Sequence, residues 1–271
     1  MATQYKTIHL IRHAQGYHNL ARTTLTELRR LILFGGWRTI KLGRLLQLLS
    51  SIWLSILSRI VPSYRFDASL TPTGWLQVEK CRQMVVASGL ASKIGLVVVS
   101  PMTRTLQTAA GVFGEREIYD DNGEAKPILM KKGKTNPCTR AKPSTKSPPF
   151  VAQELCREHI VRASLSSFSF QSLLMSSRAR QAHSAAHRRR DISSYSAEFP
   201  GIDFSLVQHD QDVLWRPGVE ESLQEMQERA KAFFQWLMSR EEKEMAVVSH
   251  SYFLHEFLRA ISGSSTSDLG W

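Results

Sequence analysis

Cysteine is scarce in this sequence. The 271 residues include three cysteines, and their spacing is not that of a metal site: Cys81, Cys138 and Cys156. Cysteines that are few and odd in number favour a reducing compartment, so we expect a cytoplasmic protein. The N-terminal stretch MATQYKTIHL has no basic segment followed by an apolar one, and we therefore predict no secretory signal.

Hydrophobic runs long enough to cross a membrane are also lacking. In the apolar stretch RLLQLLSSIWLSILSRIV, only fourteen residues separate Arg44 from Arg59. A spanning helix needs roughly 20 apolar residues. We predict an amphipathic helix that is buried or covered by a partner. A helix lying on a membrane surface, over about 44–61, is the weaker alternative.

Acidic residues are rare between positions 126 and 190. This region holds fourteen Lys and Arg against two acids, Glu154 and Glu158, and so accounts for the formal charge of +11. It offers few aromatic side chains on which bases could stack. We predict a solvated basic loop and no specific nucleic-acid partner, with non-specific polyanion binding as the alternative.

Three segments share a pattern that predicts the fold. Each has a β-branched apolar run, a basic or hydroxyl residue at its end, and then a helical pattern: TIHLIRH from Thr7, IGLVVVSPMTR from Ile94 and EMAVVSH from Glu244. Continuous apolar runs that alternate with helices are typical of parallel strands buried on both faces. We predict an α/β fold, a three-layer α/β/α sandwich with a mostly parallel central sheet.

Two of the intervening helices carry clear signals. In the first, Thr71 is the predicted N-cap, Pro72 the first helical residue and Gly89 the terminator. The second, VEESLQEMQERAKAFFQWLMSR, has an apolar stripe formed by Val219, Leu223, Met226, Ala230, Phe233 and Leu237.

The ends of the three predicted strands supply cationic and imidazole side chains. Because ligands of an α/β sheet bind beyond the carboxyl ends of its strands, these side chains should meet in one crevice: Arg12, His13, Arg104 and His250. Guanidinium groups bind phosphate bidentately and stay charged, and a neutral imidazole can attack phosphorus. The pattern predicts phosphoryl chemistry without a metal ion or other cofactor.

Three motifs resemble those of the histidine phosphatase superfamily, also called phosphoglycerate mutase-like: LIRHAQGYHN, VVSPMTRTLQTA and VVSHSYFLHEFL. Further stretches resemble its plant and fungal phosphoglycerate mutase-like branch, among them FDASLTPTGWLQV, ELCREH and DQDVLWRPGVEES. The resemblance covers about 7–20, 64–119, 148–159 and 188–262, which is well over half of the chain.

The resemblance implies roles for individual residues. His13 would be the nucleophile that forms phosphohistidine, while Arg12, Arg104 and His250 hold the phosphoryl group. Gln15 and Asn19 match positions on the substrate side. A carboxylic acid must protonate the leaving oxygen, and Glu158 matches best, with Glu154 as the second candidate. The alternative for Glu158 is a helix-surface acid paired with Arg162.

The chain departs from the family pattern in three places. Segments at about 22–62 and 160–187 resemble insertions, and the sequence ends at SGSSTSDLGW, where the family usually adds one more strand. We therefore expect one histidine phosphatase-like domain over 1–271 with two insertions and a truncated C-terminal sheet edge.

These observations predict an enzyme, a phosphatase that hydrolyses a small phosphorylated metabolite through phosphohistidine. The alternatives are phosphoglycerate mutase-type transfer and a catalytically weak protein that binds phosphate esters or protein partners. The sequence indicates neither the substrate nor an oligomeric state.

Overall fold

The computed structural model describes residues 5–19, 66–116, 130, 141–142, 148–160, 187–216 and 219–262. Predictions for 22–62, with its helix at 44–61, for 161–186, for Cys138 and for the end of the chain lie outside these residues. Among the described residues, no helix is long and apolar enough to span a membrane.

A parallel sheet of four strands forms the centre of the molecule, in the order β1-β6-β2-β5. The strands are β1 (Thr7–Arg12), β2 (Leu96–Val99), β5 (Phe150–Ala152) and β6 (Glu244–Ser249). Three of them correspond to the predicted segments, and β5 is an addition. A separate antiparallel pair joins β3 (Glu115–Arg116) to β4 (Ala141–Lys142).

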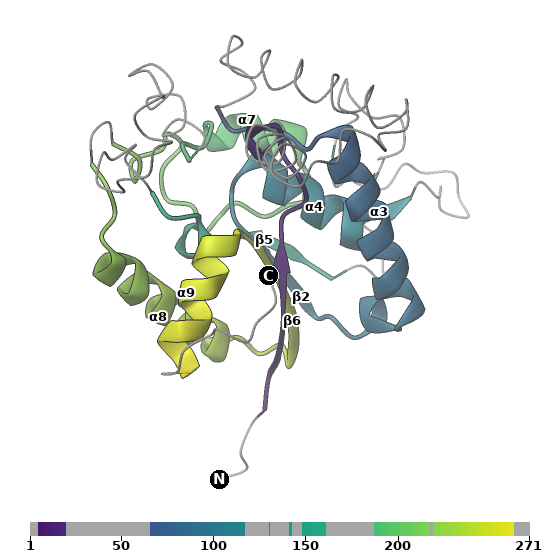
Figure 1. The fold of residues 1–271 in the computed structure, drawn as a ribbon. Coiled ribbons are helices and arrows are strands. Elements are labelled where there is room, and N and C mark those ends of the chain that lie inside the picture. The colour runs from purple at the N-terminus through teal and green to yellow at the C-terminus, as the bar shows by residue number, and fades with distance from the viewer. Residues whose placement is uncertain are drawn as a thin grey trace, which may run out of the picture.

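Helices cover both faces of the sheet, which confirms the predicted α/β fold. Figure 1 shows α3 (Pro72–Ala87) and α4 (Thr103–Phe113) on one side of the sheet, and α8 (Leu223–Ser239) and α9 (Ser251–Ser262) on the other. The core divides in the same way. Val97 and Val99 pack in one hydrophobic cluster and Leu96 and Val98 in the other, because successive side chains of a strand point to opposite faces. All four are fully buried.

The N-terminal signals of α3 are confirmed. The Thr71 side chain accepts a hydrogen bond from the backbone N–H of Gly74, and Pro72 is the first helical residue. Beyond the C-cap Ser88, Gly89 has a φ of 70°, a left-handed conformation that glycine adopts without strain. It leads into the short 3-10 helix η3 (Leu90–Ser92).

The apolar stripe predicted for α8 is wrong at its first two positions. Val219 lies before the helix, and Val219 and Leu223 are 56% and 46% exposed. The helix begins later because Ser222 and Glu225 form a capping box, in which each side chain accepts a hydrogen bond from the other residue's backbone. The rest of the predicted stripe is buried: Met226, Ala230, Phe233 and Leu237.

Two short elements complete the described chain, the 3-10 helix η4 (Glu154–Cys156) and α7 (Ile192–Glu198). Since the four central strands are parallel, their carboxyl ends meet at one edge of the sheet. His13 follows β1 directly, Ser100 follows β2 and His250 follows β6. The topology thus brings side chains that are far apart in the sequence to one place.

Candidate active site

The loop after β1 is fastened to two neighbouring elements. The N–H of His13 donates to the carbonyl of Ser249, at the end of β6, over 2.9 Å. The N–H of Ala14 donates to the hydroxyl of Thr108 on α4 over 3.1 Å. These bonds leave Arg12 exposed and His13 buried.

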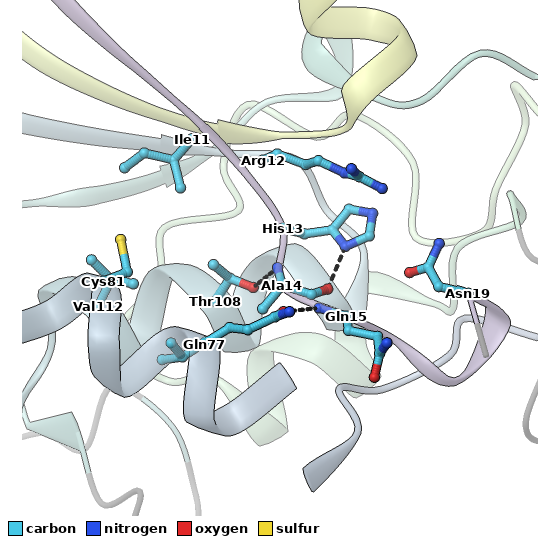
Figure 2. Close-up of a pocket in the computed structure, with 11 residues that line it drawn as sticks. Ile11, Arg12, His13, Ala14, Gln15, Asn19, Gln77, Cys81, Thr108 and Val112 are labelled. Carbon is cyan, nitrogen blue, oxygen red and sulfur yellow. Dashed lines mark hydrogen bonds between the residues drawn. The ribbon is translucent and has the colours of Figure 1, made fainter. Parts of the chain in front are cut away.

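The hydrogen bonding of His13 fixes its tautomer. Nδ1 lies 2.7 Å from the carbonyl oxygen of Ala14, as Figure 2 shows. Because a carbonyl can only accept, Nδ1 carries the proton and Nε2 keeps its lone pair. Burial, and then the guanidinium of Arg104, hold the pKa of His13 well below its usual value. His13 is therefore a neutral imidazole at physiological pH with Nε2 available as a nucleophile.

His250 has the opposite tautomer. Its Nδ1 lies 3.3 Å from a guanidinium nitrogen of Arg104, which can only donate, so Nδ1 accepts. The proton is on Nε2, which lies 2.9 Å from the Ser100 hydroxyl oxygen. Burial and the nearby Arg104 hold the pKa of His250 well below its usual value. His250 thus orients Arg104, and its predicted contact with a phosphoryl group stays a prediction.

Arg104 lies in the first turn of α4 rather than at a strand end. It is 1% exposed. The turn is held by Asp67, whose carboxylate accepts from the N–H of Thr103 over 2.8 Å and from its hydroxyl. Arg190 donates to the same carboxylate over 2.9 Å. A network centred on the buried Asp67 therefore fixes the residue next to Arg104.

A cavity of about 270 Å³ lies beside His13. It is lined by Arg12, His13, His18, Asn19, Arg104, Glu158, His159, His187, Ser251 and Tyr252. Its lining combines two guanidinium groups and the N-terminal turn of α9 with a single carboxyl group. Both the cations and the helix terminus favour an anionic ligand.

That carboxyl group belongs to Glu158. One oxygen accepts from the N–H of Phe253 over 3.2 Å and from the N–H of His159 over 3.1 Å. Burial raises the pKa of Glu158 above its usual value, although these bonds and Arg104 oppose the rise. Glu158 lies outside any helix. The second candidate, Glu154, does not line the cavity and accepts from Arg189 over 2.7 Å.

Gln15 and Asn19 are placed differently. Asn19 lines the cavity of Glu158, whereas both residues line a neighbouring cavity of about 400 Å³. In Figure 2 the Gln15 side chain points away from the His13 ring. Its amide oxygen accepts from the hydroxyl of Thr71 over 2.9 Å. The structure therefore brings Asn19, but not Gln15, to the cavity that holds both Arg104 and Glu158.

Sequence reasoning missed five lining residues: His18, His159, His187, Ser251 and Tyr252. Four of them had a usable signal, since Ser251 and Tyr252 open the helix after His250, and His18 and His159 stand inside quoted motifs. His187 had none. Within the described ranges, no group of three or more His, Cys, Asp or Glu side chains could hold a metal ion.

Comparison with known proteins decides the family. Residues 193–270 match the histidine phosphatase superfamily (branch 1). A phosphoglycerate mutase-like protein of Arabidopsis thaliana is 38% identical over 264 residues, which cover 97% of this chain and 78% of the relative. The chain belongs to the histidine phosphatase superfamily and, within it, to the phosphoglycerate mutase-like proteins.

Other known proteins are also similar to this chain. Phosphoglycerate mutase-like protein 2 of Arabidopsis thaliana is 41% identical over 261 residues, covering 94% of this chain and 66% of the relative. Among solved structures, a phosphoserine phosphatase mutant of Entamoeba histolytica in complex with phosphoserine aligns over 93% of this chain and 78% of its own. Its 13% identity and TM-score of 0.37 are too low to carry a functional argument.

Proposed function

We propose that the chain hydrolyses a small phosphate monoester through a phosphohistidine at His13. The observation that carries the proposal is the His13 tautomer. Its Nδ1–H is held by the Ala14 carbonyl, which leaves the Nε2 lone pair in a cavity with Arg12, Arg104 and Glu158. Nucleophile, charge clamp and acid are the three groups that phosphoryl transfer to a histidine needs.

The reaction takes two steps. First, Nε2 of His13 forms a bond to phosphorus while the bond from phosphorus to the ester oxygen breaks, and Glu158 gives its proton to that oxygen. The free alcohol leaves. Water then attacks phosphorus, the Glu158 carboxylate takes a proton from it, and the phosphorus–nitrogen bond breaks. Inorganic phosphate is released, and both residues return to their starting protonation states.

The charged side chains that line the cavity support each step. Arg12 and Arg104 compensate the negative charge of the transferring group, which spreads over its oxygens in the transition state. The raised pKa of Glu158 increases its protonated fraction, as a general acid requires. Free Cys81 and Cys156 are compatible with reaction in a reducing compartment, the cytoplasm.

Mutase-type transfer is the second candidate, favoured by the names of the relatives. A mutase transfers the phosphoryl group back to another hydroxyl of the same intermediate and releases no net phosphate. Incubation with phosphoglycerates separates the two activities, because a phosphatase yields inorganic phosphate and a mutase yields the isomer.

A phosphate-release screen over sugar phosphates, phosphoglycerates, nucleotides and phosphoamino acids tests the proposal. We expect release by the native chain and a loss of at least about 1,000-fold in His13→Ala. His9→Ala is the matched control, because His9 lies on β1, the strand that leads into His13, and pairs with Glu244 instead of lining the cavity. Full activity in His13→Ala would refute the mechanism. If neither the native chain nor His9→Ala released phosphate from any of these esters, the proposed function would be refuted.

A further inference from the structure

The segment that carries Glu158 has no regular secondary structure of its own. Residues 157–160 follow η4 without belonging to any helix or strand. Under the proposed function, on which this inference rests, the Glu158 carboxyl must be held beside His13. The contacts of the neighbouring backbone show how it is held.

Arg229, on α8, holds the start of the segment. One of its guanidinium nitrogens donates to the carbonyl oxygens of Leu155 and Arg157, over 2.8 and 2.9 Å. The central guanidinium carbon of Arg229 lies 5.0 Å from the centre of the Phe253 ring. The backbone N–H of Phe253 donates to Glu158. Arg229 thus contacts the backbone just before Glu158 and the ring of the residue whose N–H binds the Glu158 carboxyl.

Glu221 holds the end of the segment. Its backbone N–H donates to the carbonyl of Ile160 over 3.0 Å, and its carboxylate accepts from the N–H of Ile160 over 3.3 Å. Its carbonyl oxygen lies 2.7 Å from Nε2 of His159, which must donate. Three contacts therefore fix the two residues that follow Glu158.

Arg229 and Glu221 also bind each other. Two guanidinium nitrogens of Arg229 donate to the two carboxylate oxygens of Glu221, over 2.6 and 2.7 Å. The side chains are only 12% and 11% exposed, so water screens this bidentate pair weakly. The linked Arg229 and Glu221 side chains therefore bind the backbone on both sides of Glu158.

We propose that the Arg229–Glu221 pair positions Glu158 for proton transfer to the leaving group. Neither residue lines the cavity, and neither touches the reacting atoms. The pair acts through backbone carbonyls and N–H groups, which place the carboxyl beside His13. Displacing an acid by about 1 Å is enough to cost up to about 100-fold in rate.

Leaving-group dependence separates this role from a purely structural one. An alkyl phosphate such as glycerol phosphate needs a proton on its poorly leaving alkoxide. The phenolate of p-nitrophenyl phosphate is a good leaving group and departs without one. A displaced Glu158 should therefore slow the first ester selectively, whereas general loss of the fold slows both equally.

The kinetic test uses Arg229→Lys, Glu221→Gln and Glu158→Gln. Lysine keeps the charge of Arg229 but cannot bind both Glu221 oxygens and two carbonyls at once. We expect kcat/KM on glycerol phosphate, which reports only the first step, to fall about 10- to 100-fold in all three variants, and kcat/KM on p-nitrophenyl phosphate to stay within about 3-fold. Equal losses on both esters in Arg229→Lys and Glu221→Gln would overturn the proposal.

Arg240→Lys is the matched control. Arg240 pairs with Glu242 at the end of α8, and its side chain is 37% exposed. The same replacement there alters an Arg–Glu pair just beyond the same helix without touching 157–160. We expect both esters to be hydrolysed at the native rate by this variant, and a selective loss on glycerol phosphate would overturn the proposal.

A second measurement does not depend on turnover. NMR titration of isotope-labelled glutamate, with Glu158→Gln to assign the signal, reports the pKa of Glu158. We expect a raised pKa in the native chain and a fall towards the usual value in Arg229→Lys, since the carboxyl then reaches water. An unchanged titration would overturn the positioning role. If the native chain hydrolyses neither ester, the proposed function fails, and this titration still decides the position of Glu158.

Discussion

The rings of His13 and His250 meet edge to face, with centroids 5.1 Å apart and planes at 66°. Their tautomers differ, because His13 donates from Nδ1 to a carbonyl and His250 accepts at Nδ1 from Arg104. Two adjacent imidazoles are thus both neutral, and each has a separate task. His13 presents a lone pair, and His250 holds the guanidinium that would bind the phosphoryl group.

The pH dependence should differ between substrates. Below the lowered pKa of His13 the nucleophile is protonated, so activity on every ester falls at acid pH. Above the raised pKa of Glu158 the acid has lost its proton, so activity on alkyl phosphates falls as pH rises. We expect a bell-shaped pH profile of kcat/KM for glycerol phosphate and no alkaline limb for p-nitrophenyl phosphate. The same alkaline limb with both esters would contradict the assignment of Glu158.

Asp67→Asn should weaken both the fold and the site. An amide cannot accept from the N–H and the hydroxyl of Thr103 and also pair with Arg190. We expect a loss of about 1–3 kcal/mol in the free energy of unfolding, measured with urea, and slower turnover because Thr103 precedes Arg104. Asp203→Asn is the control, since Asp203 is exposed and its carboxylate accepts from the N–H of Ser205. Equal effects in both variants would contradict this.

Asp212→Asn should lower the free energy of unfolding more than Asp67→Asn does. Asp212 accepts two hydrogen bonds from Arg157, over 2.7 and 2.8 Å, and the two side chains are 0% and 2% exposed. The substitution leaves the buried guanidinium with only its longer carboxylate contact, to Glu154 at 3.4 Å, for which we expect a loss of about 3 kcal/mol at neutral pH.

The same variant has a pH signature. Burial alone would raise the pKa of Asp212, but the bonds from Arg157 outweigh it and hold that pKa below its usual value. Its contribution is therefore present above the unfolded pKa of about 4 and disappears as pH falls through the lower folded value. Urea unfolding should show the difference between native chain and variant shrinking at acid pH. A difference in unfolding free energy that did not change with pH would contradict a stabilising ion pair between Asp212 and Arg157.

Gly74→Ala should disturb the His13 loop through backbone contact. A Cβ at this position would lie 2.2 Å from the carbonyl oxygen of Gln15, so the first turn of α3 or the loop must move. We expect a loss of about 1–3 kcal/mol in unfolding free energy together with lower activity. Gly95→Ala is the control, because its nearest neighbour is the flexible side chain of Glu242, at 3.3 Å. Native activity in Gly74→Ala would show that the loop tolerates the shift.

The sequence predicts the parts of this fold that local signals control. Strands buried on both faces read as apolar runs, and the Thr71 cap marks the start of α3. The strand β5 was missed because it is only three residues long, FVA, and lies at the edge of the described sheet. At α8, the Ser222–Glu225 capping box overrides the apolar periodicity that begins at Val219.

The candidate site likewise combines residues that local sequence predicts with residues whose placement depends on contacts distant in the chain. Arg12 ends β1, and His13 and His250 directly follow β1 and β6, so topology alone brings them together. The place of Glu158 depends instead on Arg229, Glu221 and Phe253, which lie more than 60 residues along the chain. The tautomer of His250 depends on the Arg104 guanidinium, and its Nε2 meets the Ser100 hydroxyl only once β2 and β6 are adjacent. Contacts of this kind have no signature in local sequence.

Detection of the phosphoenzyme tests the central claim most directly. The native chain is mixed with a radiolabelled phosphate ester, quenched in base, and assayed for protein-bound phosphate that acid releases. We predict such label in the native chain and in His9→Ala, and none in His13→Ala. Absence of label from a chain that releases phosphate, or label that persists in His13→Ala, would contradict a phosphohistidine at His13.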